Sequence, residues 1–102
     1  MSYLVLLDDR AVNDIQYIMD YYDFKQSGLG DRFKKVVDKY FSALSIQPYF
    51  QIKYDSVHCL PIKKWPYMIH FTVDKKNKKV YVRAVVPTKA NPDKYWLKQL
   101  SS

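Results

Sequence analysis

The sequence predicts an α+β fold, in which a short N-terminal strand and a two-helix hairpin pack on one face of an antiparallel sheet. Three observations support this expectation. A short β-rich run opens the chain, apolar residues then recur with helical spacing, and after Pro48 the spacing changes to alternation. The 102 residues are 48% hydrophobic and 17% aromatic, which is far from a disordered composition. We therefore expect one folded domain over residues 1–102.

The first strand is expected at Tyr3–Leu7, and a helix follows it. Asp8 or Asp9 can cap the start of that helix, and Gly28 and Gly30 are expected to close it. The apolar stripe of the first helix comprises Val12, Ile15, Ile18, Met19 and Tyr22. The stripe of the second helix comprises Phe33, Val36, Val37, Tyr40, Phe41 and Leu44, and Pro48 prevents its continuation. Both stripes are expected to face the core.

After Pro48 the segments FQIKYD, VHCLPIKK, YMIHFTVD and KVYVRAVV read as short strands. DKKNKK is expected to form a hairpin tip, and pairing of Asp74 with Lys79 would set the register. One face would then be apolar and cover the helices, with the pairs Val73–Val80, Phe71–Val82 and Ile69–Ala84. The other face would stay open, with the pairs Thr72–Tyr81, His70–Arg83 and Met68–Val85.

The last segment, NPDKYWLKQL, predicts a short C-terminal helix. Asn91 would cap it and Pro92 would take its first position, while Tyr95, Trp96 and Leu100 would pack back onto the protein.

Several classes of protein are disfavoured by composition. The apolar runs are much shorter than the roughly 18 residues that a membrane-spanning helix needs, and the first ten residues lack the features of a signal peptide. The single cysteine, Cys59, cannot form an internal disulfide, and no Cys/His spacing resembles a zinc site. We expect a cytoplasmic protein without metal, cofactor, small-molecule substrate or membrane contact.

Charge is distributed unevenly along the chain. The residues through Gln51 include six basic residues and seven aspartates, a net charge of −1. The remainder has eleven basic residues and three aspartates, a net charge of +8. Such asymmetry favours a polyanion or an acidic protein as the partner of the C-terminal half. The lysines of the DKKNKK tip are an exception, because spare lysines accumulate at exposed hairpin tips.

Several segments, taken in order, resemble the RelE/ParE superfamily of bacterial type II toxins. They are DIQYIMDYY, GLGDRFKKVVDKYFSALSIQP, KKWPYMIHFTVD, VYVRAVVPT and NPDKYW, and together they cover about residues 8–96. WPY and NPDKYW are closer to the ParE and plasmid-stabilisation branch. The resemblance implies a growth-inhibiting toxin that a cognate antitoxin, encoded nearby, holds inactive. ParE-like toxins inhibit DNA gyrase, whereas RelE-like toxins cleave mRNA in the ribosomal A site.

The sequence offers only weak candidates for residues that would catalyse RNA cleavage. Cleavage by 2′-hydroxyl attack needs a base, an acid and cations around the phosphate. Lys89 and Tyr95 match a basic and a tyrosine position of RelE-like nucleases, while Arg83 and His70 are expected nearby on the open face. Two positions depart from the family pattern. Met68 stands where RelE-like nucleases commonly have an arginine, and Pro87 stands where ParE-like relatives often have a histidine.

The sequence therefore favours a toxin that acts by binding its target rather than by catalysis. We expect Lys63, Lys64, Arg83 and Lys89 to form a positive rim for the antitoxin or the target. Strand alternation would let only one of Lys63 and Lys64 face that rim, unless the chain turns at Pro66. A RelE-like ribonuclease is the main alternative. An inactive toxin relic or a general RNA-binding protein is a further one, because fold does not determine function.

Overall fold

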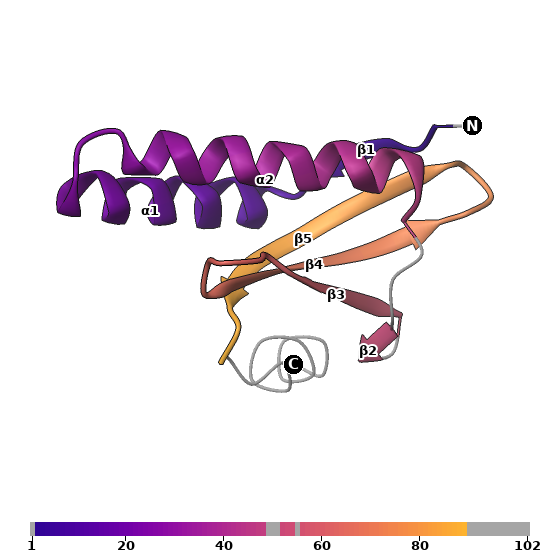
Figure 1. Cartoon of the computed structure of the whole chain (residues 1–102). Helices are drawn as coiled ribbons and strands as arrows, with labels where there is room; N and C mark the ends of the chain where they lie inside the picture. The colour runs from indigo at the N-terminus through magenta and orange to yellow at the C-terminus, as the bar shows by residue number, and fades with distance from the viewer. Residues whose placement is uncertain (1, 49–51, 55, 90–102) are drawn as a thin grey trace.

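A computed structural model describes residues 2–48, 52–54 and 56–89 of the chain. Two helices follow an N-terminal strand, and four more strands follow the helices (Figure 1). The elements are β1 (Leu4–Leu7), α1 (Asp9–Lys25), α2 (Leu29–Ile46), β2 (Ile52–Tyr54), β3 (Val57–Pro61), β4 (Tyr67–Asp74) and β5 (Lys79–Pro87). The α+β class is thus confirmed. The expected C-terminal helix lies outside the described residues.

The five strands form one sheet in the order β1-β5-β4-β3-β2. The sheet is mixed, because β1 pairs in parallel with β5 whereas the other neighbours are antiparallel. The helical excursion between β1 and the other strands allows this parallel pairing, since parallel neighbours need a long connection. Both helices lie on the same face of the sheet (Figure 1). Among the described residues, neither helix is long and apolar enough to cross a membrane.

Two glycines shape the join between the helices, although not as caps of α1. Helix α1 ends at Lys25, and Gly28 precedes α2 with a left-handed φ of 89° that suits glycine. Gly30 lies inside the first turn of α2, where a Cβ atom would come within 2.5 Å of the Met19 carbonyl oxygen. Its backbone N–H donates to the Asp23 carboxylate at 2.8 Å. The expectation that both glycines close α1 was therefore wrong, since Gly28 supplies the left-handed turn before α2 and Gly30 permits the close approach of α2 to α1.

The start of α1 also differs from the expected side-chain cap. Asp8 occupies the N-cap position, but its side chain makes no capping hydrogen bond. Its carboxylate instead accepts from Arg83 of β5. Val12 was assigned to the buried stripe but is 50% exposed, whereas Ile15 and Ile18 are buried as expected. The helix therefore packs through a narrower face than its sequence pattern indicated.

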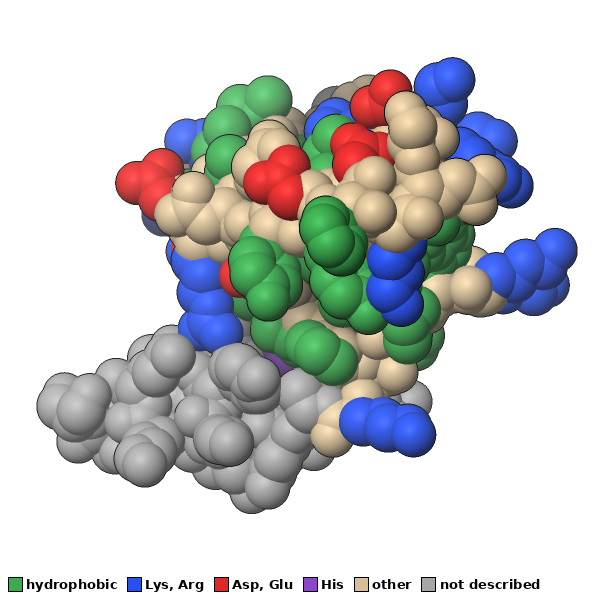
Figure 2. Space-filling model, turned by 90° about the vertical axis from the view of Figure 1, so that its left-hand side faces the viewer, with side chains coloured by type: hydrophobic (Ala, Val, Ile, Leu, Met, Phe, Trp, Pro, Cys, Tyr) green, Lys and Arg blue, Asp and Glu red, His purple; other side chains and the backbone are tan. Residues whose placement is uncertain are grey.

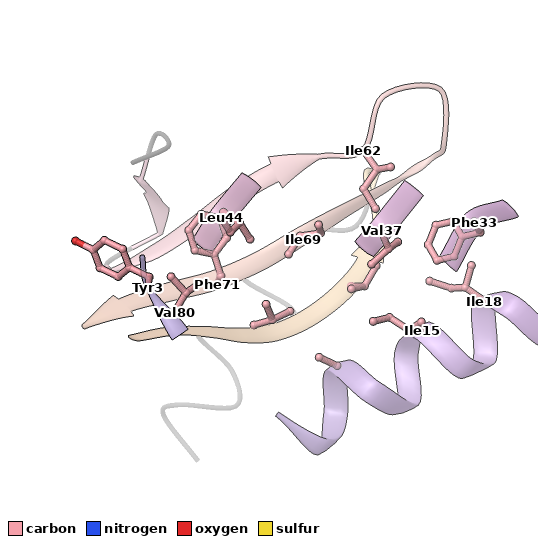
Figure 3. Packing of buried hydrophobic residues seen from close by; sticks show 13 residues of the cluster. Tyr3, Ile15, Ile18, Phe33, Val37, Leu44, Ile62, Ile69, Phe71 and Val80 are labelled. Atoms are coloured by element: carbon pink, nitrogen blue, oxygen red, sulfur yellow. The ribbon is translucent and has the colours of Figure 1, made fainter. Parts of the chain in front are cut away.

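The core lies between the helices and the sheet (Figure 3). Phe33 and Val37 of α2 and Phe71 of β4 are fully buried there, as expected. The other buried members are Tyr3, Ala11, Ile15, Ile18, Leu44, Ile62, Ile69, Val80, Val82 and Val85. Tyr40 and Phe41 are only partly buried at its margin.

The β4–β5 hairpin has the expected register only near its tip. Asp74 pairs with Lys79 and Phe71 with Val82, but an irregularity between His70 and Phe71 shifts the pairing from there on. His70 then pairs with Ala84, Ile69 with Val85, and Met68 with Val86. The expected pairs His70–Arg83, Ile69–Ala84 and Met68–Val85 were therefore wrong. An extra residue in one strand is a β-bulge, which leaves that residue without a partner across the ladder.

The bulge determines which residues face the helices. Val82 and Val85 belong to the main core even though they are three positions apart. Ala84 was expected in that core, but it lies in a second buried cluster with Cys59, Met68 and Val86. Because side chains alternate along a strand, this cluster lies on the face opposite the helices. The far face, expected to be open at these positions, is therefore apolar and buried there.

Candidate functional site

The loop between β3 and β4 contains the paired lysines and is anchored to the helices. The ring of Trp65 lies 5.0 Å from Tyr22 of α1 and 5.1 Å from Phe33 of α2, in edge-to-face contacts. Such contacts add to the hydrophobic effect of burying the rings. Phe33 is fully buried, so the loop is held against the core of the protein.

Tyr67, the first residue of β4, extends this aromatic cluster. Its ring lies 5.7 Å from Phe33 and 6.3 Å from Tyr22. Burial, together with a hydrogen bond to Tyr22, raises the pKa of Tyr67 to about 12. The Tyr67 hydroxyl is therefore harder to deprotonate than an ordinary tyrosine, which makes it a poor general base.

The backbone of the loop is fixed as well. Ile62 donates its N–H to the Tyr67 carbonyl, and Trp65 donates to the Ile62 carbonyl. The N–H of Lys63 donates to the hydroxyl of Tyr40 at 2.8 Å, which ties the loop to α2. Lys64 has a φ of 72°, in the left-handed region that is uncommon for a residue with a side chain. Both lysines are exposed. Since they lie in a turn, strand alternation does not restrict them.

Lys89 lies at the same end of the sheet. It is exposed in the turn after β5, where the N–H of Thr88 donates to the Pro66 carbonyl at 3.0 Å. Tyr67 and Pro87 are register partners, so the loop before β4 and the turn after β5 are adjacent. We call Lys63, Lys64 and Lys89 the lysine end. This end combines three exposed positive charges with an anchored backbone.

Arg83 does not belong to the lysine end. It precedes Pro87 by four residues, which is roughly 13 Å along a strand. Its guanidinium forms a salt bridge to Asp8 at 3.1 Å, donates to the Thr72 hydroxyl, and lies over the Tyr81 ring. Arg83 follows Val82, the register partner of Leu7, so it lies next to Asp8 at the end of β1. Its contacts are those of a residue that connects β5 to the start of α1.

His70 is fully buried, contrary to the expected exposed position. Burial, and to a smaller extent the positive charge of Arg10, lowers the pKa of His70 to about 4. His70 is thus neutral at pH 7 and enclosed by protein.

The two positions that depart from the family pattern have different surroundings. Met68 is buried in the far-face cluster, whereas Pro87 is exposed at the end of β5. Tyr95 lies outside the described residues. Within the described ranges, no group of three or more His, Cys, Asp or Glu side chains could hold a metal ion.

Sequence reasoning did not identify the residues that position the loop. Trp65 and the Tyr40 hydroxyl position the loop. Asp8 and Thr72, which were not identified either, position the side chain of Arg83. Trp65 had a signal, because a tryptophan beside a proline in a lysine-rich turn is an unusual choice for a solvated loop. The contact of Asp8 with Arg83 had no signal in the sequence, since 75 positions separate the two residues.

Known structures share this arrangement. A chain of "Chromosomal ParDE TA system from P. aeruginosa" aligns with a TM-score of 0.73 and 14% identity, over 83% of this chain and 95% of that one. A mutant of the E. coli toxin RelE in the free state aligns with a TM-score of 0.62 and 16% identity, over 98% and 99% of the two chains. The RelE mutant in complex with an antitoxin RelBc peptide aligns with a TM-score of 0.51 and 15% identity, over 93% of each chain.

No protein-family model matches the chain, and no curated protein matches its sequence. The likeness to solved structures therefore concerns the fold, and it covers nearly all of the matched chains. The protein has the fold of the matched ParDE-system chain and of RelE.

Proposed function

We propose that this protein is the toxin of a type II toxin–antitoxin system and that it acts in the ParE manner, by binding an essential target such as DNA gyrase. The observation that carries the toxin assignment is the alignment with the ParDE system and with RelE over almost their whole length. Fold alone does not determine function, so the choice between the two modes of action depends on the residues of this chain.

The surroundings of the candidate catalytic residues favour binding over RNA cleavage. His70 is buried and neutral, and Arg83 is held by Asp8. Met68 supplies no positive charge, and it is buried. A ribonuclease needs acid, base and cationic groups that all reach the scissile phosphate. The lysine end, by contrast, provides charge on a fixed backbone, which is what a binding surface needs.

Growth arrest after induced expression tests the proposal. We expect wild type to arrest growth and the Lys63→Ala/Lys64→Ala double variant, or Lys89→Ala, to do so much less. The matched control is Lys75→Ala/Lys76→Ala, which removes the same charge from the β4–β5 turn at the opposite end of the hairpin. Circular dichroism checks the folding of each variant. Undiminished arrest by all folded lysine-end variants would overturn the role of this surface.

Assays with the purified protein separate the two modes of action. We expect inhibition of gyrase supercoiling, and no cleavage of mRNA on translating ribosomes. Charge reversal at Lys63, Lys64 and Lys89 should weaken target binding roughly tenfold, because rim charges mainly change association rates. Ribosome-dependent cleavage that Arg83→Ala abolishes would instead assign the protein to the RelE-like mode.

The proposed partner is a cognate antitoxin with an acidic and apolar C-terminal segment. That segment would fold on the toxin and cover the basic half of the chain, whose net charge is +8. Calorimetric titration at increasing salt should show weaker binding, because salt screens the exposed charge pairs. A tight complex that salt does not change would contradict an electrostatic contribution.

A further inference from the structure

The flank of α1 that faces away from α2 exposes three aromatic rings. Tyr17, Tyr21 and Phe24 are 75%, 44% and 92% exposed. Their spacing of four and three residues places them in one row along the helix. The ammonium of Lys25 lies 4.7 Å from the centre of the Tyr21 ring. We call these three residues the aromatic row. In a protein of this size such a row is a large exposed apolar feature, and features of this kind mark interaction sites.

A groove continues the aromatic row toward the sheet. Its volume is ≈ 200 Å³, and it lies between α1 and the end of the β4–β5 hairpin. Its lining comprises Arg10, Asp14, Tyr17, Ile18, Tyr67, Val85, Val86 and Pro87. Asp14 accepts the N–H of Val85 at 3.0 Å, so its carboxylate forms part of the wall of the groove. The groove and the row together form a trough that is mostly apolar and that runs along α1.

The charge beside the trough is negative, unlike that of the chain as a whole. Helix α1 has four aspartates against two basic residues, Arg10 and Lys25, which also adjoin the trough, whereas the chain has a net charge of +7. At 3.6 residues per turn, Asp9 and Asp20 project about 20° apart and within about 60° of Phe24. Within the described ranges, neither carboxylate is in a salt bridge. Acidic side chains accompany exposed hydrophobic ones on the helical layer (Figure 2).

We propose that this trough binds an amphipathic helix of a partner protein whose apolar residues recur every three or four positions and whose outer edge has lysines or arginines. The apolar side chains would pack on Tyr17, Tyr21 and Phe24, and one of them would enter the groove. The basic edge would lie opposite Asp9 and Asp20. Helix α1 is 17 residues long, roughly 25 Å, which accommodates about four turns of a partner helix.

The charge argues against an acidic occupant. An acidic antitoxin segment would be repelled by Asp9 and Asp20, whereas the lysine end would attract it. The trough and the lysine end therefore fit partners of opposite charge. This inference does not depend on the proposed function, since it requires only the exposed row, the groove and the two carboxylates.

Two synthetic helical peptides provide the test. Both have leucines at heptad spacing over 17 residues, and they differ only in having lysines or glutamates along one edge. Fluorescence anisotropy should show that the lysine peptide binds the full-length protein at least tenfold more tightly. Equal binding of the two peptides, or tighter binding of the glutamate peptide, would overturn the proposal. The latter result would assign the trough to an acidic partner instead.

Variants locate the binding on α1. Tyr17→Ser and Phe24→Ser should each weaken lysine-peptide binding at least fivefold, and Asp20→Lys should shift the preference toward the glutamate peptide. The control is Ile46→Ser, which removes a 73% exposed apolar residue from α2. An equal loss in the control would show non-specific adsorption and overturn the proposal. So would concentration-dependent dimerisation that Phe24→Ser abolishes, since a second copy would then occupy the trough.

Discussion

Two lysine-rich turns lie at opposite ends of strand β4, and they are built in different ways. The turn between β4 and β5 contains three lysines and is closed by Asp74, which accepts from the backbone N–H and the side-chain amide of Asn77. The loop between β3 and β4 has only two lysines, but Trp65 and the Tyr40 hydroxyl join it to both helices. Each turn has one lysine with positive φ, Lys78 or Lys64.

Charge density alone therefore does not identify a binding surface. The turn with more lysines is closed by a contact within four residues, and it joins the edge strand β1, where the Lys78 carbonyl accepts from the Leu4 N–H at 2.9 Å and the Lys78 ammonium lies 5.0 Å from the centre of the Tyr3 ring. The loop with fewer lysines is attached to buried residues, so its charges keep a defined position relative to the core. A preorganised surface loses less entropy when a partner binds. We therefore place the candidate site at the anchored loop.

The largest expected effect comes from removing the residue beneath the anchor. Phe33→Ala should lower the free energy of unfolding by about 3–5 kcal/mol, because Phe33 is fully buried and contacts Trp65, Tyr22 and Tyr67. Urea unfolding measures the change. The control is Phe24→Ala, which removes the same side chain from an exposed position and should change stability by less than about 0.5 kcal/mol. Similar losses in both variants would contradict the packing described.

A second effect is the change of stability with pH, which should come from the buried far face and not from the exposed hairpin tip. The folded-state pKa of His70, about 4, lies below its ordinary value of 6.5, so the unfolded chain binds a proton first as pH falls. His70 should therefore cost up to about 3 kcal/mol of stability between pH 6.5 and pH 4. Asp14, whose pKa is raised by burial, acts in the opposite direction, and the depressed pKa of Asp74 affects the tip only at lower pH.

Urea unfolding at pH 7, 5.5 and 4.5 tests this pH dependence. The His70→Gln variant should be less stable at pH 7 but should lose less of its remaining stability on acidification than wild type. Parallel pH profiles for the two proteins would contradict the burial of a neutral imidazole.

A smaller effect tests the polar part of the anchor. Tyr40→Phe removes the acceptor of the Lys63 N–H and should cost about 1 kcal/mol. Amide hydrogen exchange at Lys63 should become faster, while exchange at Asn77 in the other turn should not change. Unchanged protection at Lys63 would show that the aromatic contacts alone hold the loop.

The smallest effect separates the charge of each turn from its backbone conformation. Lys64→Gly and Lys78→Gly should each change stability by less than about 1 kcal/mol, in the stabilising direction, because glycine adopts positive φ without the steric cost. If the lysine end binds the target, only Lys64→Gly should reduce growth arrest. Thermal unfolding and induced expression measure the two effects, and equal loss of toxicity would remove the distinction between the turns.

The elements were predictable from sequence because their signals are local. Helical spacing through Leu44, the break at Pro48 and the alternation afterwards depend only on neighbouring residues, and so does the tip register from Asp74 to Lys79. The hairpin as a whole also brings Lys63, Lys64 and Lys89 to one end of the sheet, although the bulge shifts the pairing there by one residue. The bulge was not predictable, because the run from Arg83 to Val86 is compatible with either pairing until the helices select one face.

Local signals along the chain are enough to predict the α+β class, the two helices, the hairpin tip and the concentration of positive charge in the second half of the chain. The burial of His70, the salt bridge of Arg83 with Asp8 and the anchoring of the lysine loop by Trp65 arise only from packing. The physical reason is range. Periodicity and turn chemistry act between residues a few positions apart, whereas burial and ion pairing depend on segments that only packing brings together.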